Sequence, residues 1–216
     1  MNSPASASAS RSKRKPWAIP AGLTALALAG LAAWQFWPSG DPTLSIPENV
    51  CQGALPSDWV KTLLPERGES FQEKNAYNYS DATPGGRESP GGGKCNLSGG
   101  GEKLMINWYR MQSASFTSED LERDAAKPGN TPIQLGEAWG YHSGPGVDLF
   151  ASCPYTKDRG ALLAIQIGLS GLPDEVDRAT IQHLANLAAD AARVVARDVI
   201  GCEGAENLPD GPPRLN

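Results

Sequence analysis

The longest uninterrupted hydrophobic stretch of the chain lies near its N-terminus, over residues 17–37. It contains no charged side chain, and at about 1.5 Å per residue a helix of this length spans roughly the hydrocarbon core of a bilayer. Trp17 at one end and Trp34 and Trp37 at the other stand where aromatic rings settle, at the water–lipid boundary. A basic cluster precedes the stretch and predicts a cytoplasmic N-terminus. We therefore expect a transmembrane helix over residues 17–37, preceded by a disordered basic stub over residues 1–16.

A cleaved secretory signal is the alternative interpretation of the same segment, because it too joins a basic region to an apolar one. Small residues that suit cleavage occur over residues 31–33. The length of the apolar stretch and the aromatic residues at both of its ends favour a retained anchor. Both alternatives place the rest of the chain outside the cytoplasm. We expect a single-pass cell-membrane protein whose C-terminal domain is extracellular.

Composition and periodicity divide the rest of the chain into three parts. Three prolines within residues 38–50 predict a semi-rigid stalk. Residues 51–204 alternate between helical and strand patterns, and we expect them to form one extracytoplasmic domain. Residues 205–216 are polar and rich in proline and glycine, which predicts a disordered tail.

Hydrophobic spacing within the domain predicts both helices and strands. Helices are expected over residues 55–64, 117–127 and 173–200. Strands are expected over residues 76–79, 94–98, 102–111 and 161–169, with two or three more over residues 132–153. This order of elements predicts an α+β fold, in which one antiparallel sheet packs with helices.

Two of these elements have patterns that predict the placement of individual side chains. Along residues 102–111, apolar positions alternate with Met105, Asn107 and Tyr109, and we expect Asn107 to be half exposed. His183 of the long helix is expected on a solvated face. Residues at helical spacing form the expected buried stripe of the same helix, namely Ile181, Leu184, Ala188, Ala191, Val195 and Val199.

The four cysteines, Cys51, Cys95, Cys153 and Cys202, all follow the apolar segment. None belongs to a C-x-x-C pair and the chain has two histidines, so we expect neither a metal site nor a cofactor. In an oxidising compartment an even number of cysteines predicts two disulfides, for which three pairings exist. We favour Cys51–Cys95 and Cys153–Cys202, because each pair ties together one half of the domain. Cys202 also follows the long helix, within reach of a strand residue such as Cys153.

The charge of the chain excludes one class of partner. The formal net charge is −5, but the four basic residues of the N-terminal stub conceal a larger imbalance. The remainder has 15 basic and 24 acidic residues, a net charge of −9. Nucleic-acid binding requires clustered lysine and arginine, so we expect no nucleic-acid partner. The glycine-rich run before Lys94 also fails as a phosphate loop, because Glu88 and Cys95 stand where glycine and serine or threonine are required.

His142 is the side chain that the sequence singles out as a candidate, with Tyr141 and Trp139 beside it as a ligand site. It ends a predicted strand next to a Gly/Pro turn, where an imidazole could serve as a general base toward a neighbour such as Ser143. The alternative is a partly exposed histidine of the turn with no chemical role. We assign no catalytic residue, since adjacency in sequence is not the geometry of a triad.

Cysteine spacing and element order together carry a resemblance to a known group of proteins. The matching features are Cys51 directly before a short helix, a second cysteine in a central strand, and Cys153 tied to a C-terminal helix. Over residues 48–204 the layout resembles small actinobacterial membrane-anchored or lipoprotein domains of unknown function. It is also distantly similar to the disulfide-linked extracytoplasmic sensor domain of mycobacterial serine/threonine kinases. The resemblance implies binding or sensing outside the cell.

These observations favour a membrane-anchored extracytoplasmic binding or accessory module, whose partner is an unknown ligand or protein of the cell envelope. One alternative is a cell-envelope hydrolase that uses His142 with a carboxylate or Ser143; we regard an enzyme as the less favoured class. The other alternative is a structural envelope protein, which would have a surface without a concave pocket.

Overall fold

The computed structural model describes residues 41–80, 91–115, 118–155, 157–173 and 175–216. Residues 41–216 form one compact unit, and the predicted anchor over residues 17–37 lies outside the described residues. No helix within the described ranges is long and apolar enough to cross a membrane. The elements, in chain order, are β1 (Asn49–Val50), β2 (Leu55–Pro56), α2 (Asp58–Leu63), β3 (Gln72–Tyr77), β4 (Gly92–Gly99), β5 (Glu102–Met111), η1 (Ser113–Ser115), α3 (Ser118–Ala125), β6 (Thr131–Leu135), β7 (Ala138–Ser143), β8 (Gly146–Ser152), β9 (Leu162–Leu169), α4 (Arg178–Val194), η2 (Val195–Ile200), η3 (Ala205–Asn207) and β10 (Arg214–Leu215).

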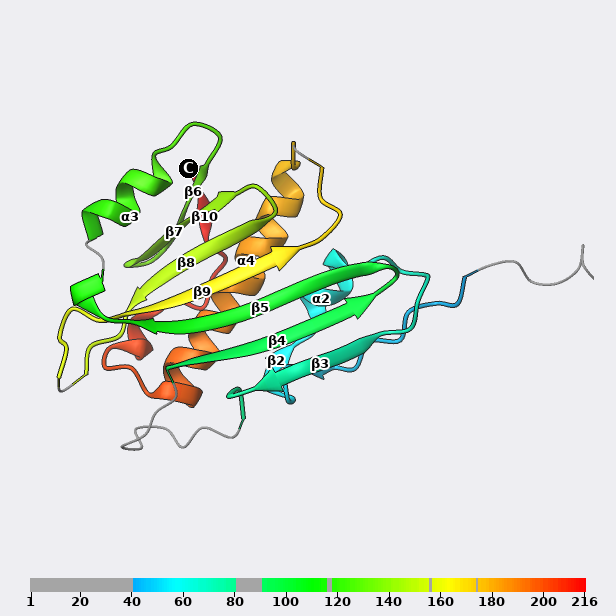
Figure 1. Cartoon of the computed structure of the whole chain (residues 1–216), viewed down its shortest axis with the longest axis horizontal. Coiled ribbons are helices and arrows are strands. Elements are labelled where there is room, and N and C mark those ends of the chain that lie inside the picture. The colour runs from blue at the N-terminus through cyan, green and yellow to red at the C-terminus, as the bar shows by residue number, and fades with distance from the viewer. Residues whose placement is uncertain (1–40, 81–90, 116–117, 156, 174) are drawn as a thin grey trace, which may run out of the picture. The chain divides into compact units, whose positions relative to one another are not determined.

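An eight-stranded antiparallel sheet organises the domain, with the strand order β10-β6-β7-β8-β9-β5-β4-β3 (Figure 1). Tight turns join β4 to β5, β6 to β7 and β7 to β8, so neighbouring strands are mostly neighbours in sequence. Gly100 and Gly101 have φ angles of 63° and 90°, which a residue without a Cβ adopts readily. The predicted α+β fold with an antiparallel sheet and helices is therefore confirmed.

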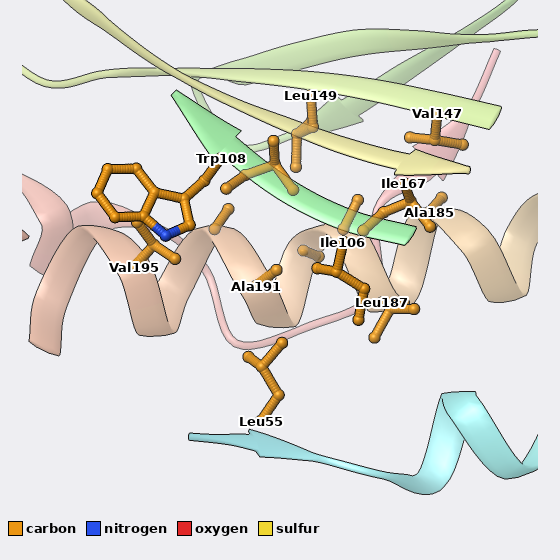
Figure 2. Packing of buried hydrophobic residues seen from close by; sticks show 14 of the residues in the cluster. Leu55, Ile106, Trp108, Val147, Leu149, Ile167, Ala185, Leu187, Ala191 and Val195 are labelled. Atoms are coloured by element: carbon orange, nitrogen blue, oxygen red, sulfur yellow. The ribbon is translucent and has the colours of Figure 1, made fainter. Parts of the chain in front are cut away.

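Helix α4 packs against the strands β8 and β9 at the centre of the sheet and forms the main core there. Figure 2 shows α4 lying between the sheet, which contributes Ile106 and Leu149, and β2, from which Leu55 points toward the helix. All six residues of the predicted helical stripe are buried. We call the side of the sheet that faces α4 the inner face and the opposite side the outer face.

Helix α4 begins later than the sequence predicts. It starts at Arg178 instead of Pro173, because the Asp177 carboxylate accepts hydrogen bonds from the backbone N–H groups of Ala179 and Thr180 and so caps it. The helix continues through the π-helical turn η2 and ends at Gly201, whose φ of 69° matches the predicted glycine stop.

The two disulfides have the predicted pairing. Cys51 is bonded to Cys95 and Cys153 to Cys202, with Cα atoms 5.4 and 4.8 Å apart. Each bond closes a loop of 44 or 49 residues, worth about 4 kcal/mol in the chain-entropy model.

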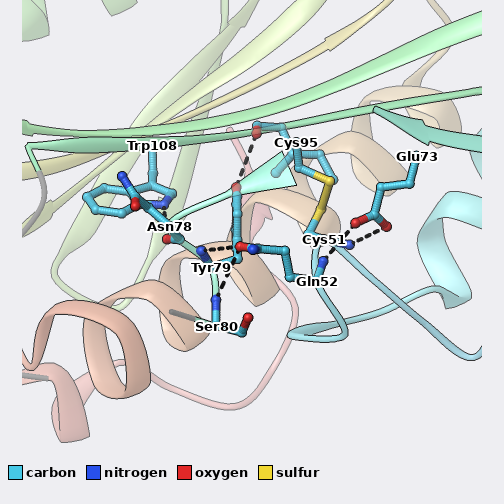
Figure 3. Close-up of a disulfide and its surroundings, with 9 residues drawn as sticks. Cys51, Gln52, Glu73, Asn78, Tyr79, Ser80, Cys95 and Trp108 are labelled. Carbon is cyan, nitrogen blue, oxygen red and sulfur yellow. Dashed lines mark hydrogen bonds between the residues drawn. A yellow bond between two sulfur atoms is a disulfide. The ribbon is translucent and has the colours of Figure 1, made fainter. Parts of the chain in front are cut away.

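The first disulfide sits in a network of hydrogen bonds that fixes the chain on both sides of β3. The carboxylate of Glu73 accepts from the backbone N–H groups of Cys51 and Gln52, at 2.8 Å each (Figure 3). Both of these residues have positive φ, an unfavourable conformation for residues other than glycine, and these charge-assisted bonds help to hold it. The Gln52 side chain then accepts from the backbone N–H of Tyr79, whose hydroxyl donates to the Ile106 carbonyl.

The predicted disordered tail over residues 205–216 is wrong. Strand β10 pairs with β6 and extends the sheet, and the side chains of Leu208 and Leu215 are buried. Two arginines of the C-terminal helix hold the connecting segment, since Arg193 donates to the carbonyl of Pro209 and Arg197 to that of Leu208. The segment rich in proline and glycine is ordered, because the guanidinium groups donate hydrogen bonds to carbonyls that have no strand partner.

The predicted stalk over residues 38–50 is wrong for residues 41–50. From Asp41 onward the chain belongs to the compact unit, and the backbone N–H of Leu44 donates to the Glu66 carbonyl at 2.7 Å. Leu44 and Ile46 pack against the core. Their apolar side chains are the physical reason why this part of the Pro-rich segment is folded.

The expected solvated face of the long helix is covered by α2. His183 stacks on Trp59 with ring centroids 5.6 Å apart, and the Trp59 indole donates to the Asp190 carboxylate at 3.0 Å. Asn186 on the same side is 7% exposed. The prediction for His183 failed because polar residues on a helix face mark solvent only when no other element packs there.

Candidate functional site

The outer face of the sheet has two halves that differ in coverage. Over β7 and β8 it carries α3, and Leu121, Phe150 and Ala164 form a small second core there. Over β3, β4, β5 and β9 the outward side chains form what we call the open half. In Figure 1, α3 lies beside β7, whereas β3 and β4 form the opposite edge of the sheet. Of the outward residues on these strands, Met111, Leu162 and Ala164 belong to or pack against the second core. We define the open half by twelve others: Gln72, Lys74, Tyr77, Lys94, Asn96, Ser98, Lys103, Met105, Asn107, Tyr109, Gln166 and Gly168.

The open half gathers the exposed hydrophobic surface of the domain. Within the described ranges three large hydrophobic side chains are exposed, namely Tyr77 at 49%, Met105 at 43% and Tyr109 at 43%. All three belong to the open half. Scattered exposed hydrophobics need no explanation, but a group confined to one face indicates a contact surface.

The open half is also basic, in a domain that is otherwise acidic. It carries Lys74, Lys94 and Lys103, which are three of the six lysines that follow the apolar segment. No aspartate or glutamate is among its twelve residues. None of the three ammonium groups forms an ion pair with a carboxylate of the described residues. Their positive charge is therefore available to a ligand.

A cavity of about 620 Å³ opens on this face. Its lining includes Lys74, Lys94, Asn96, Lys103, Met105 and Gly168. A second cavity of about 180 Å³ adjoins it, and the two share Met105, Pro145 and Gly168. Gly168 contributes no side chain to the surface that the two cavities share. Together they have the concave shape and mixed polarity of a ligand site.

A row of polar side chains crosses the sheet along the smaller cavity. Lys94, Asn107, Gln166, Asp148 and Tyr141 occupy adjacent register positions on five strands. The Gln166 amide hydrogen-bonds to the Asp148 carboxylate. Burial raises the pKa of Asp148, and this hydrogen bond opposes the shift.

Asn107 is the least expected member of the row. It is 7% exposed, so the prediction of a half-exposed side chain is wrong: neighbours on both adjacent strands surround it. Its Oδ1 atom is buried and has no hydrogen-bond partner within the described residues. Buried polar atoms in native proteins are usually hydrogen-bonded, so an unpaired acceptor beside a cavity indicates where a donor group could bind.

The three residues singled out from the sequence are divided between the two faces. Trp139 and Tyr141 point outward and lie near Phe150, with ring centroids 5.2 and 6.3 Å from its ring. His142 points inward and is 5% exposed, which corrects the expectation of a partly exposed turn histidine. Ser143 lies on the outward side, because successive residues of a strand alternate.

His142 itself is held in a desolvated position. Burial lowers its pKa, while a hydrogen bond to the Gly144 backbone opposes the shift. Its Nε2 atom is buried and has no hydrogen-bond partner in the described part of the chain. This geometry supplies no nucleophile to the imidazole.

Sequence reasoning overlooked the three lysines and the open half. A signal was present, since Lys94 and Asn96 alternate with the buried Cys95 and Leu97 along one strand. The order of the strands decides which outward residues become neighbours, and that order cannot be deduced from one strand alone.

No protein-family model, curated protein or solved structure matches this chain at the significance required. Nor, among the residues described, do three His, Cys, Asp or Glu side chains converge as a metal site would require.

Proposed function

We propose that this protein is a membrane-anchored extracytoplasmic binding module, and that the open half is its ligand-binding face. One observation carries the proposal: the three exposed large hydrophobics and the three unpaired lysines lie on one surface without a carboxylate, where the lysines and Met105 line a cavity of about 620 Å³. Lysines in a chain of net charge −5 spread over the surface would serve solubility alone. Their grouping with exposed aromatic rings supports recognition.

Independent features support the proposed compartment and the proposed membrane anchor. The two disulfides support an oxidising environment outside the cytoplasm. The uncharged stretch over residues 17–37 supports an anchor in the same membrane that the domain would face. The resemblance to extracytoplasmic sensor and lipoprotein domains is in keeping with a binding role.

The placement of His142 favours binding over hydrolysis. Its imidazole lies on the inner face, while Ser143 and the cavities lie on the outer face. A general base must reach the proton that it removes, and the sheet separates these groups. The cavities likewise favour a binding module over a purely structural envelope protein.

The test compares two charge-matched variants of the full-length chain in nanodiscs of neutral phosphatidylcholine. One replaces the lysines of the open half (K74Q, K94Q and K103Q), and the other replaces the remaining exposed lysines, Lys61, Lys127 and Lys157, in the same way. Binding to a solubilised cell-envelope fraction is measured by biolayer interferometry. We expect the first variant to lose binding and the second to retain it. Equal binding by both variants would show that the open half is not the site.

A further inference from the structure

We infer that the ligand of the open half is an acidic glycan, whose phosphate or carboxylate groups meet the lysines and whose hydroxyl groups meet the polar row. This inference rests on the proposed function and adds the chemical class of the ligand. Two subsites with different chemistry carry it, together with the junction that joins them.

The larger cavity provides the anion subsite. Lys74, Lys94 and Lys103 line it, and no carboxylate is among its lining residues. An ammonium group is a compact charge with three donors, suited to the oxygens of phosphates and carboxylates. Asn96 and Ser98 add neutral polar groups to the same lining. A neutral ligand would leave three like charges uncompensated here.

The smaller cavity provides a subsite of acceptors. The Asn107 Oδ1 atom is buried and unpaired, and the half-buried carboxylate of Asp148 and the side chain of Gln166 line the same space. Such a group of acceptors selects a ligand that donates hydrogen bonds. Hydroxyl groups are neutral donors, and they avoid the repulsion that a cationic ligand would meet from the neighbouring lysines.

The junction indicates that one ligand spans both subsites. Met105, Pro145 and Gly168 line both cavities, so the two spaces meet at these residues. The exposed rings of Tyr77 and Tyr109 lie on the same face of the sheet, outside the lining of both cavities, and offer apolar faces to the C–H surface of a sugar ring. A polyhydroxylated molecule with acidic substituents offers anionic groups to the lysines, hydroxyl donors to the acceptors of the smaller cavity, and C–H surfaces to the tyrosine rings.

The same geometry weighs against an anionic lipid surface. A membrane could contact Lys74 and Lys103, which are exposed, and the exposed tyrosines. A flat bilayer would meet these exposed groups and leave Asn107, which is 7% exposed and lines the smaller cavity, without a contact. The polar row therefore favours a ligand whose hydrogen-bond donors can enter the smaller cavity over a flat lipid surface.

The closing experiment titrates the full-length chain in phosphatidylcholine nanodiscs by isothermal calorimetry. The probes are trigalacturonate, a phosphorylated maltotriose, the neutral trisaccharides galactotriose and maltotriose, hexaglutamate, and phosphatidylglycerol vesicles. We expect at least one acidic trisaccharide to bind about tenfold or more tightly than its neutral counterpart and than hexaglutamate. The uronate and phosphate arms show which acidic group carries the charge.

Gly168→Val is the variant that isolates the junction. A Cβ at this position would lie 3.4 Å from the flexible end of Met105 and in ordinary contact, so the fold accepts a side chain there. The substitution keeps every charge but fills space where the two cavities meet, and we expect at least a tenfold loss of acidic trisaccharide binding. Gly168→Ala is the matched control, with a smaller loss, and circular dichroism verifies the fold of both variants.

Each alternative result of these experiments would contradict a specific part of the proposal. Tighter binding of vesicles or of hexaglutamate than of any acidic trisaccharide would replace the glycan by a lipid surface or an acidic peptide. Unchanged trisaccharide binding by Gly168→Val would remove the two-subsite arrangement. If no acidic trisaccharide binds but the envelope fraction still binds through the three lysines, the ligand class is wrong and the proposed function stands. If the lysine variants of the open half bind that fraction normally, the proposed function itself fails.

Discussion

The two halves of the outer face are built on one sheet and face the same direction, yet one is closed and the other is open. On the closed half, Phe150 and Ala164 are buried beneath Leu121 of α3. On the open half, the equivalent positions of the neighbouring strands carry lysine, tyrosine and methionine with large exposed fractions. The contrast shows that a strand's outward residues acquire their role from the element above them.

The closed half should dominate stability. Phe150→Ala would remove a ring that is 5% exposed and contacts Trp139, and we expect it to lower the free energy of unfolding by about 3–5 kcal/mol. Tyr109→Ala on the open half should change it by less than about 0.5 kcal/mol. Urea denaturation of both variants measures the difference. Similar losses for the two would mean that the open half is packed against something in the folded protein.

The open half should dominate binding and its dependence on salt. Replacing Lys74, Lys94 and Lys103 by glutamine should weaken ligand binding about a hundredfold, equivalent to about 2.7 kcal/mol. Raising the salt concentration from 0.05 to 0.5 M should weaken the wild type and leave the residual binding of the variant nearly constant. An affinity that does not respond to salt would contradict an electrostatic ligand site.

Asn107 should separate stability from binding at a single position. Asn107→Leu replaces an unpaired buried acceptor by an apolar side chain of similar volume, and we expect stability to be unchanged or to rise by about 1 kcal/mol. Ligand affinity should fall at the same time, because the acceptor is lost. Denaturation and calorimetry on the same preparation test both parts, and a destabilised variant would show that Asn107 has a structural role instead.

His142 on the inner face should make the stability of the fold depend on pH. We expect this to be the smallest of these effects. Burial lowers the pKa of His142 in the folded state, so the folded protein binds fewer protons than the unfolded chain just below pH 6.5. Stability from this group is therefore present above about pH 6.5 and falls as the pH drops toward the folded pKa.

The raised pKa of Asp148 acts in the opposite sense. Its contribution is largest when the carboxyl is protonated and declines as the pH rises through and above the usual range of an aspartate, near pH 4. Comparison of the wild type with His142→Gln at pH 8 and pH 5.5 separates the two groups, because Asp148 is common to both proteins. Equal losses of stability in the two proteins would mean that the pKa of His142 is the same in the folded and unfolded states.

Several structural details could be predicted because they depend on short stretches of chain. The buried stripe of α4 and the hairpin of β4 and β5 follow from local periodicity, and the disulfide pairing follows from the order of these elements. The sequence predicts only the end of strand β3, because residues 72–75 are polar on both sides of an edge strand and show no hydrophobic pattern. It does not predict the ordered tail for a similar reason: β10 is two residues long and is held by pairing with β6.

The sequence by itself determined the α+β class, the two disulfides, the alternation of each long strand and the uncharged N-terminal stretch that predicts an anchor. Each depends on composition or on spacing between near neighbours, where backbone geometry imposes a period of 2 or 3.6 residues. The tertiary structure alone decided that α3 covers one half of the outer face and that three lysines converge on the other. It also buried Asn107 and turned His142 inward. These outcomes depend on strand order and on which helix packs where, and both are set by the summed packing of residues far apart in the chain.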